Sequence, residues 1–467
     1  KPLHPEWMMQ WLEDDRPEGI GPGPENLGWF CFNSPYRDWI VEYLSEYLDH
    51  LDLDGFFFDD MNWGSHEGQP LYTACTCDYC REIYSSETGR EIPLKVDFDS
   101  IDFRRFVVWR YDKVREFLAH VVSGVRTNHP LTILDFNYYG EQAKWGMAAP
   151  FNPLGLEKVG GYFFIESGWG TIEHRGGFSA KIARAHGSPF GLWRSSTQGL
   201  DGSCWGFPPH AEPYSPALYG LTAVAHGGGF FFCGMQYAVD LRADFIKRVF
   251  AEVKQRVDYM GGETVKYVAL HLSQSSMDFL PSEFQFGHRD AELYDTEEKQ
   301  KWAEKNKYVR NVYADRVRAT YDMLGPSQLL TDVVFDEQLT EEILAPFKVL
   351  FLSNSACLSD QQCGVVDRFV HNGGTLIATH QTSLLDELGE ERGNFGLAEL
   401  CGLDYAGPAA DGKDHAVAYV LQDGPLASEF GPFMCFTGRV SKVVPKQGME
   451  LEVLATRCSI EGPNPVD

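Results

Sequence analysis

Two adjacent carboxylates, Asp59 and Asp60, follow directly on the apolar run Gly55–Phe58. The run is short, aromatic and bounded by glycine and acids, a pattern typical of a buried strand in a parallel sheet. An acid that directly ends such a strand is held by the backbone and can act as a nucleophile or in proton transfer. Because side chains alternate along a strand, only one of the two acids should face a site. Ordinary strand termination is the alternative interpretation, since Asp is common there.

Two further acids stand in comparable places later in the chain. Glu166 directly ends another apolar run, and Glu141 lies shortly after a third. The aromatic residues before Glu166, together with Trp169, should raise the pKa of this glutamate and keep it protonated near neutrality. We therefore expect one ionised and one protonated carboxyl group, from Asp59 and Glu166, with Asp60 and Glu141 as the alternatives.

Three of the eleven cysteines form a C-x-C-x-x-C cluster of Cys75, Cys77 and Cys80. This spacing suits metal thiolates better than disulfides, because cysteines so close in sequence are poorly placed to pair with one another. Cys31 is the candidate for a fourth ligand, brought near by the fold. Four thiolates would hold zinc in a closed, structural site; the alternative is a group of unligated cysteines in a reducing compartment.

The elements that must position these residues follow a βα alternation from residue 36 to residue 259. Strands are predicted at 55–58, 131–136, 160–165, 189–193 and 229–233, and helices at 36–50, 103–127, 179–186, 217–226 and 241–259. Ser34 should cap the first helix, with Pro35 at its first position. A closed (β/α)₈ barrel needs eight strands, so three would lie upstream of Lys1; an open sheet of these five is the alternative.

From residue 263 the pattern predicts a doubly wound, Rossmann-like α/β domain. Its strands should lie at 266–272, 328–335, 347–352 and 373–378, and its helices at 307–324, 339–344 and 360–370. No G-x-G-x-x-G motif follows any of these strands, and Ser353–Cys357 does not form a glycine-flanked nucleophile elbow, which favours a structural or assembly role. Beyond it we expect a short C-terminal β segment, with domains at 1–262, 263–406 and 407–467.

The chain has 467 residues and a formal net charge of −27 at pH 7. This charge disfavours nucleic acid and anionic membrane as partners, because both would repel the protein. No run of about 18 apolar residues predicts a membrane span. The chain begins at Lys1 without a signal-peptide pattern, so any targeting segment would lie upstream, and the compartment is unknown with the cytoplasm favoured.

The first region carries four motifs: His4-Pro5-Glu6-Trp7, Asn33-Ser34-Pro35-Tyr36-Arg37, Asp54-Gly55-Phe56-Phe57-Phe58-Asp59-Asp60, and Cys75-x-Cys77-x-x-Cys80-Arg81. Their order resembles the glycoside hydrolase superfamily of the family-42 β-galactosidases, and more closely the related hypothetical glycosyl hydrolase 6 barrels. Segments 347–352, 373–376 and 394–398 are similar to the β-galactosidase trimerisation domain.

The resemblance implies a (β/α)₈ barrel, a trimerisation-type domain and a homotrimer. It also implies that Cys31, Cys75, Cys77 and Cys80 correspond to the zinc ligands of the family's zinc loop. Family-42 enzymes have an Asn-Glu pair after the fourth strand, where this chain has Asp59-Asp60. An Asp at that place is similar to the nucleophile of α-fucosidase and α-galactosidase barrels. If three strands lie upstream, Asp59 stands there.

Two functional hypotheses follow. The chain is either a retaining exo-glycosidase that releases a terminal sugar of the fucose or galactose class, with Asp59 as nucleophile and Glu166 as general acid/base, or a non-catalytic carbohydrate-binding barrel with an assembly domain. They differ in whether a second carboxyl group faces the first. Metal-dependent hydrolysis through His66, Glu67 and His226 lacks a supporting motif. Residues expected to bind the sugar, some of them by ring stacking, are His4, Trp63, Asn137, Tyr139, Trp169, Trp193, Arg194 and His226.

Overall fold

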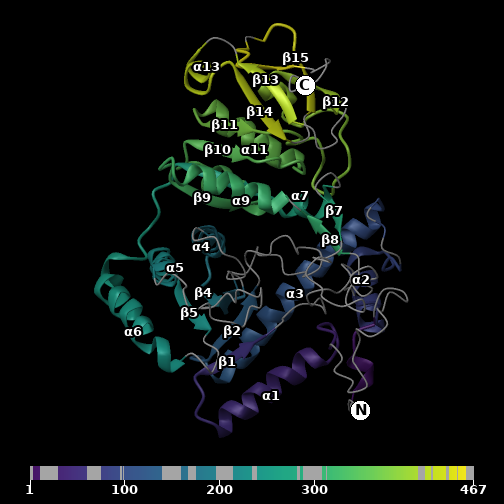
Figure 1. Cartoon of the computed structure of the whole chain (residues 1–467). Helices are drawn as coiled ribbons and strands as arrows, with labels where there is room; N and C mark the ends of the chain where they lie inside the picture. Colours follow the sequence, from purple (N-terminus) through teal and green to yellow (C-terminus); the bar gives the residue numbers. More distant parts are fainter. Residues whose placement is uncertain are drawn as a thin grey trace, which may run out of the picture.

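The computed structural model of the chain has two α/β regions and a C-terminal β region, stacked one above the other (Figure 1). It describes residues 4–10, 30–59, 75–94, 97, 99–138, 159–166, 175–195, 214–233, 239–280, 284–287, 308–311, 313–408, 416–421, 424–437, 441–449 and 451–458. None of the helices in these ranges has both the length and the apolar character that crossing a bilayer requires.

The first region is built on a parallel sheet in the order β1-β2-β3-β4-β5. Its strands are β1 (Gly55–Phe58), β2 (Ile133–Tyr138), β3 (Tyr162–Glu166), β4 (Phe190–Ser195) and β5 (Gly229–Cys233). All five predicted strands are present, which confirms the α/β class. Among the described residues the sheet is open and does not close into a barrel.

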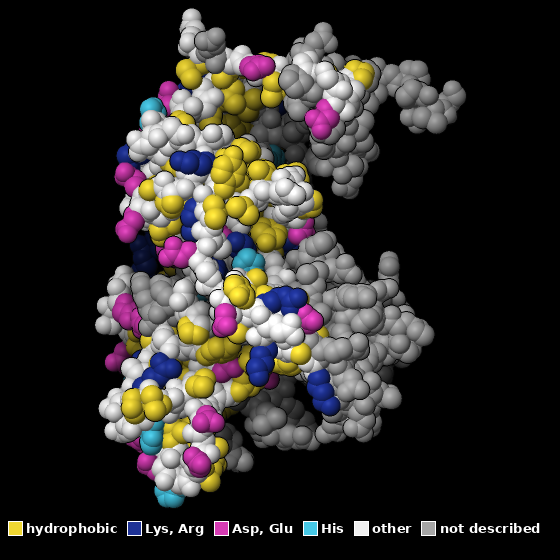
Figure 2. All heavy atoms as spheres, turned by 90° about the vertical axis from the view of Figure 1, so that its left-hand side faces the viewer, with side chains coloured by type: hydrophobic (Ala, Val, Ile, Leu, Met, Phe, Trp, Pro, Cys, Tyr) yellow, Lys and Arg dark blue, Asp and Glu magenta, His cyan; other side chains and the backbone are white. Residues whose placement is uncertain are grey.

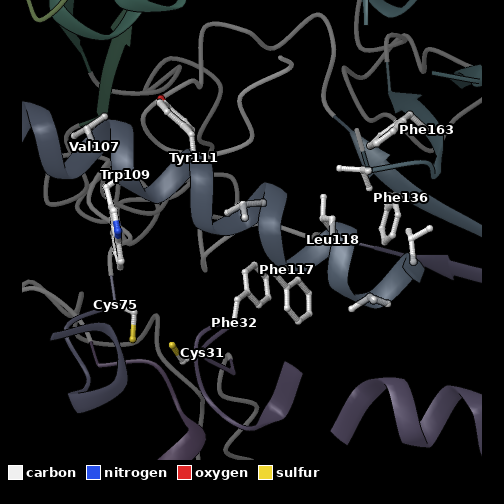
Figure 3. Close-up of a cluster of buried hydrophobic side chains, with 14 of the residues drawn as sticks. Cys31, Phe32, Cys75, Val107, Trp109, Tyr111, Phe117, Leu118, Phe136 and Phe163 are labelled. Atoms are coloured by element: carbon white, nitrogen blue, oxygen red, sulfur yellow. The ribbon is translucent and has the colours of Figure 1, made fainter. Parts of the chain in front are cut away.

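Helices pack on one face of this sheet and on one another. They are α1 (Tyr36–His50), α2 (Asp78–Thr88), α3 (Ile101–Asn128), α4 (Arg175–Ala185), α5 (Tyr214–Ala225) and α6 (Val239–Arg256). Apolar residues recur at helical spacing along α3, and Phe117 and Leu118 are almost wholly buried beside Phe136 and Phe163 of the strands (Figure 3). Each such side chain stabilises the fold by roughly 1.5–3 kcal/mol.

Two local predictions need correction. Helix α1 begins at Tyr36 with Pro35 as its N-cap, so Ser34 is one residue outside; its Oγ accepts a hydrogen bond from Tyr36 N (3.3 Å). The segment after Cys77 is not a loop but α2, which contains Cys80. The cysteine spacing alone does not reveal this helix, because ligand spacing is compatible with either conformation.

The second region has a parallel sheet in the order β11-β10-β6-β9. Its strands are β6 (Val268–Leu272), β9 (Thr331–Phe335), β10 (Val349–Leu352) and β11 (Thr375–Ala378), and its helices are α7 (Gln274–Phe279), α9 (Tyr313–Leu324), α10 (Glu341–Leu344), α11 (Asp360–His371) and α12 (Ala398–Cys401). This is the predicted doubly wound arrangement.

The helix predicted at 307–324 is wrong in its first part. Residues Tyr308–Asn311 form β8, which pairs antiparallel with β7 (Phe284–Gly287), and the helix begins only at Tyr313. Pairing with a distant strand decides the conformation here, and a local pattern does not contain it.

The C-terminal region consists of antiparallel strands. Strand β12 (Leu403–Pro408) pairs with β15 (Ser441–Pro445), while β13 (Ala416–Leu421) lies between β14 (Phe433–Thr437) and β16 (Ala455–Cys458), with α13 (Pro425–Phe430) before β14. The predicted domain limits at residues 262 and 406 remain predictions.

Buried polar contacts join the first and second regions. Lys181 of α4 donates to Asp332 of β9 (2.5 Å), and Lys266 and Thr264 donate to the second oxygen of the same carboxylate. Burial alone would raise the pKa of Asp332, but these hydrogen bonds outweigh it and lower the pKa to about 2. A second contact runs from Tyr111 of α3, whose hydroxyl donates to Asp278 of α7 (2.8 Å). The two sheets are therefore held in a fixed relation.

Candidate active site and cysteine cluster

Strands β1 and β2 bring Asp59 next to Asn137. Their parallel register pairs Gly55 with Ile133 and Phe58 with Phe136, so the next residue of β1 falls beside the next residue of β2. Asn137 is buried, and its Nδ2 donates a hydrogen bond to Asp59 Oδ1 at 2.6 Å. The carboxylate is thereby fixed at the carboxyl end of the sheet, the edge at which parallel α/β sheets carry their sites.

The alternation of side chains in β1 decides which acid faces the open side of the sheet. Phe56 and Phe58 pack into the core beneath the helices. Phe57 is 51% exposed on the other face, where its ring meets that of Phe164 at 5.1 Å. Asp59 shares the face of Phe57. Asp60 lies outside the described residues.

The open face of the sheet is aromatic. Phe164 of β3 contacts Phe231 of β5, with ring centroids 4.9 Å apart. Gly191 of β4 lies under them, and a Cβ there would stand 2.2 Å from the Phe231 ring and 2.7 Å from the Tyr162 hydroxyl. Glycine is therefore required for this close approach.

Asp135, which is not among the predicted site residues, lies on this same face. Asp135 is paired in register with Phe57 and Tyr162. It lies two residues before Asn137 and therefore on the same face of the sheet. Burial raises the pKa of Asp135 to about 7, and burial followed by the charge of Asp135 raises that of Tyr162 to about 12. The sequence signal for this residue is a single acid among the large apolar side chains of β2.

The second predicted carboxylate, Glu166, is the last residue of β3, and its backbone is in register with Trp193. Arg194 follows in β4. The backbone thus brings 166, 193 and 194 to the sheet edge that carries Asp59, with Glu166 two strands away. The remaining predicted site residues of this edge lie outside the described residues: Trp63, Tyr139, Glu141 and Trp169.

Two predicted binding residues are not brought to this edge. His226 precedes β5, at the amino end of the strand, and its carbonyl accepts a hydrogen bond from Arg184 (3.1 Å). Burial, followed by the nearby positive charges of Lys181 and Arg184, lowers its pKa to about 4. His4 lies near the start of the chain, where its ring stacks on Trp7 at 3.8 Å and its Nδ1 contacts Glu6.

The four predicted metal ligands do come together. Cys31, Cys75, Cys77 and Cys80 are all buried, and their sulfur atoms lie within 4.8 Å of one another. Cys31 Sγ is 3.4 Å from Cys80 Sγ and 3.5 Å from Cys77 Sγ. None of the four forms a disulfide. A buried group of this kind can hold a metal ion.

The donor set fits zinc in particular. Four thiolates around zinc at about 2.3 Å would stand roughly 3.8 Å apart, close to the sulfur separations in this cluster. Asn33 donates to two sulfurs, from its backbone N to Cys31 and from its side chain to Cys80, each at 3.4 Å. Contacts among the sulfurs, with Cys31 first, lower the pKa of Cys77, while contacts with the other sulfurs raise the pKa of Cys31 and of Cys80. The hydrogen bonds from Asn33 favour thiolate over thiol.

The cysteine cluster fastens the chain start and α2 onto α3. Phe32, next to Cys31, stacks on Phe117 of α3 at 4.2 Å (Figure 3). Tyr84 of α2 meets Trp109 of α3 edge-on at 5.1 Å. The cluster lies before α1 and at the start of α2, away from the open face of the sheet. Its position is that of a structural site.

A serine, a histidine and an aspartate also meet in the second region. His271 Nδ1 is 2.9 Å from Ser355 Oγ, and its Nε2 is 3.1 Å from Asp336 Oδ1. Both Ser355 and His271 are fully buried, so no substrate can reach the hydroxyl. This group ties β6, β9 and β10 together as an internal polar network.

No family model and no curated protein matches the chain. Several solved structures share its fold. A β-galactosidase from Bacillus circulans sp. alkalophilus aligns at 15% identity with a TM-score of 0.65, covering 97% of this chain and 70% of its own. A β-galactosidase from the psychrophilic Marinomonas ef1 aligns at 15% identity with a TM-score of 0.62, covering 97% of this chain and 73% of its own.

An α-L-fucosidase, isoenzyme 2 from Paenibacillus thiaminolyticus, aligns at 19% identity with a TM-score of 0.58, covering 97% of this chain and 59% of its own. At these identities the similarity speaks for the fold alone. The chain therefore shares the α/β fold of these solved structures over nearly its whole length.

Proposed function

We propose that this protein is a retaining exo-glycosidase in which Asp59 is the nucleophile and Glu166 the general acid/base. The observation that carries the proposal is the hydrogen bond from Asn137 to Asp59 Oδ1 at the carboxyl end of the sheet. A nucleophilic carboxylate must be held in one orientation, and a short hydrogen bond from an amide donor does this. The bond fixes the rotation of the carboxylate, so its second oxygen has a defined direction toward an anomeric carbon.

Glu166 is the proposed partner because of its place in the sheet. Glu166 is the last residue of β3, two strands from β1, and the alternation of side chains along a strand leads us to expect it on the face of Phe164. Retaining glycosidases need two carboxyl groups about 5–5.5 Å apart, one to attack and one to protonate the leaving oxygen. The aromatic side chains of this face would stack on a sugar ring and exclude water from it.

The substrate class proposed is a terminal galactose or fucose. The support is the fold shared with proteins described as β-galactosidases and as an α-L-fucosidase. An Asp in place of a Glu after β1 favours the fucosidase and α-galactosidase type of nucleophile, as the motif comparison implies.

A panel of nitrophenyl glycosides, with both anomers of galactose and fucose, tests the proposal. Asp59→Asn should remove almost all turnover of the substrate that the wild type cleaves, with an unchanged circular dichroism spectrum. Glu166→Gln should spare substrates with good leaving groups. Azide should rescue Glu166→Ala, because this anion attacks the glycosyl-enzyme without general-base assistance, releases the Asp59 carboxylate and gives a glycosyl azide. Near-normal activity of Asp59→Asn would refute the assignment. Saturable sugar binding without cleavage of any glycoside would favour the non-catalytic carbohydrate-binding barrel.

We further propose that the four clustered cysteines hold a structural zinc ion and that the protein assembles as a homotrimer through its second region. The zinc proposal rests on the sulfur geometry and on the Asn33 hydrogen bonds. The trimer proposal rests on the resemblance of segments 347–352, 373–376 and 394–398 to a trimerisation domain.

A further inference from the structure

A cavity of about 210 Å³ lies between the second region and the C-terminal β region, away from the open face of the first sheet. Its floor is the loop that follows β11, residues 379–383, and its opposite wall comes from α12, β12 and β15. The volume equals that of about seven water molecules at ~30 Å³ each, enough for one small organic molecule. In the space-filling view, hydrophobic side chains gather in this upper part of the molecule (Figure 2).

The cavity lies at the end of the sheet where α/β folds bind ligands. Strands β10 and β11 are parallel, and both loops that follow them run along the same edge. In doubly wound sheets, ligands bind outside the carboxyl ends of the strands. Between β6 and β10 this position is occupied by the buried side chains of His271 and Ser355. The cavity lies one strand further along, at the end of β11.

The loop under the cavity has an unusual backbone that its hydrogen bonds maintain. His380 and Ser383 have left-handed φ angles of 51° and 64°, and so has Asn354 in the adjoining loop, at 52°. Such angles are uncommon in non-glycine residues and cluster at binding sites. Asn354 Oδ1 accepts from Gln381 N at 3.0 Å, and Ser383 Oγ accepts from Leu397 N at 3.1 Å.

The lining of the cavity has a polar side and an apolar side. The polar side consists of hydroxyl groups and the imidazole of His380. His380 Nδ1 and Ser441 Oγ are 3.0 Å apart. Phe395, Leu397 and Val443 belong to the apolar side. Among the described residues that line the cavity there is no Asp, Glu, Lys or Arg, so this lining offers a charged ligand no counter-charge.

We propose that this cavity is a binding site for an uncharged aromatic alcohol of the size of a phenol. The ring would lie against Phe395 and Val443, and the hydroxyl would face the pair of His380 and Ser441. A monosaccharide is disfavoured because its hydroxyls point in all directions and would meet the apolar wall without hydrogen-bond partners. This site does not depend on the proposed glycosidase activity.

The probe for the test is 4-fluorophenol, observed by ¹⁹F NMR line broadening on the full-length chain. Saturable binding is expected, with weaker binding of fluorobenzene, which lacks the hydroxyl, and none of 4-fluorobenzoate, which is charged. Val443→Trp should fill the cavity and weaken 4-fluorophenol binding by about tenfold or more. Val444→Trp is the matched control: Val444 is the next residue of β15, is 52% exposed and does not line the cavity.

Ser441→Ala, which removes the partner of His380, should reduce the preference for 4-fluorophenol over fluorobenzene. Val443→Phe, a smaller replacement, carries the same test if the tryptophan variant does not fold. The proposal is overturned if binding of 4-fluorophenol does not saturate. It is also overturned if Val443→Trp leaves this binding intact, which would mean that the phenol binds elsewhere, for example in the first region. Equal weakening by Val444→Trp would overturn it as well.

Discussion

Asn137 Nδ2 lies 2.6 Å from Asp59 Oδ1, although the two residues are 78 positions apart in the chain. The contact arises because β1 and β2 are neighbours in a parallel sheet and end at the same edge. The expectation that Asn137 binds substrate stays a prediction; the hydrogen bond places its side chain on the proposed nucleophile. We treat it as a positioning residue.

Asn137→Ala should lower kcat on the glycoside that the wild type cleaves by roughly tenfold to a hundredfold, with little change in KM. The reason is that a loosely held carboxylate spends less time in the attacking geometry. Asn137→Asp should be worse still, because a second negative charge would stand beside Asp59. Asn372→Ala, at the exposed C-cap of α11, is the control and should keep wild-type kinetics. A large rise in KM with unchanged kcat would instead indicate a residue that binds substrate.

Protein purified without chelator should contain about one zinc ion per chain by elemental analysis, held by four thiolates. Cys75→Ser should reduce the zinc content to background and lower the melting temperature, because the chain start and α2 lose their attachment to α3. Cys401→Ser, a half-buried cysteine outside the cluster, should retain the metal. Absence of zinc from the purified wild type would contradict the proposed site.

Asp332→Asn should destabilise the protein by about 3–5 kcal/mol in chemical denaturation, since Lys181 would be left buried without its partner. The pKa of Asp332 is lowered to about 2 from an ordinary 3.8. A carboxyl group with a lowered pKa stabilises the fold above its ordinary pKa, and this contribution is lost as the pH falls from about 4 toward 2. The wild type should therefore lose more stability than the variant over this range.

Asp360→Asn serves as the control for this pair. Its side chain is 89% exposed and contacts Arg392, so its removal should cost no more than about 1 kcal/mol. Equal effects of the Asp332 and Asp360 substitutions would mean that the contact between the two regions is not a significant part of the stability.

Light scattering at micromolar concentration should give the mass of three chains of 52.7 kDa. A homotrimer is expected because the second region resembles a trimerisation domain and its one serine-histidine-aspartate group is buried. A monomeric mass at that concentration would argue against assembly through this region.

Local sequence was sufficient for elements whose apolar pattern is strong. Helix α1 and strands β1 and β5 have the predicted bounds: the apolar residues of α1 recur at helical spacing, while β1 and β5 are short aromatic runs that begin at a glycine. The local pattern does not predict β8, where pairing with β7 determines the conformation. It also does not predict α2, because the spacing of the cysteines is compatible with either a loop or a helix. At β8 the deciding contact comes from a distant part of the chain.

For the site, the sequence by itself determined the residue types: acids where strands end, and three cysteines at a metal-binding spacing. Only the tertiary structure brought Cys31 to Cys80, 49 positions away, and turned Asp59 toward Asn137 on the open face of the sheet. The physical reason is that a local pattern fixes the alternation of side chains but not which face is covered. Packing of the helices covers one face of β1, and parallel pairing then sets which residue of β2 stands beside the acid.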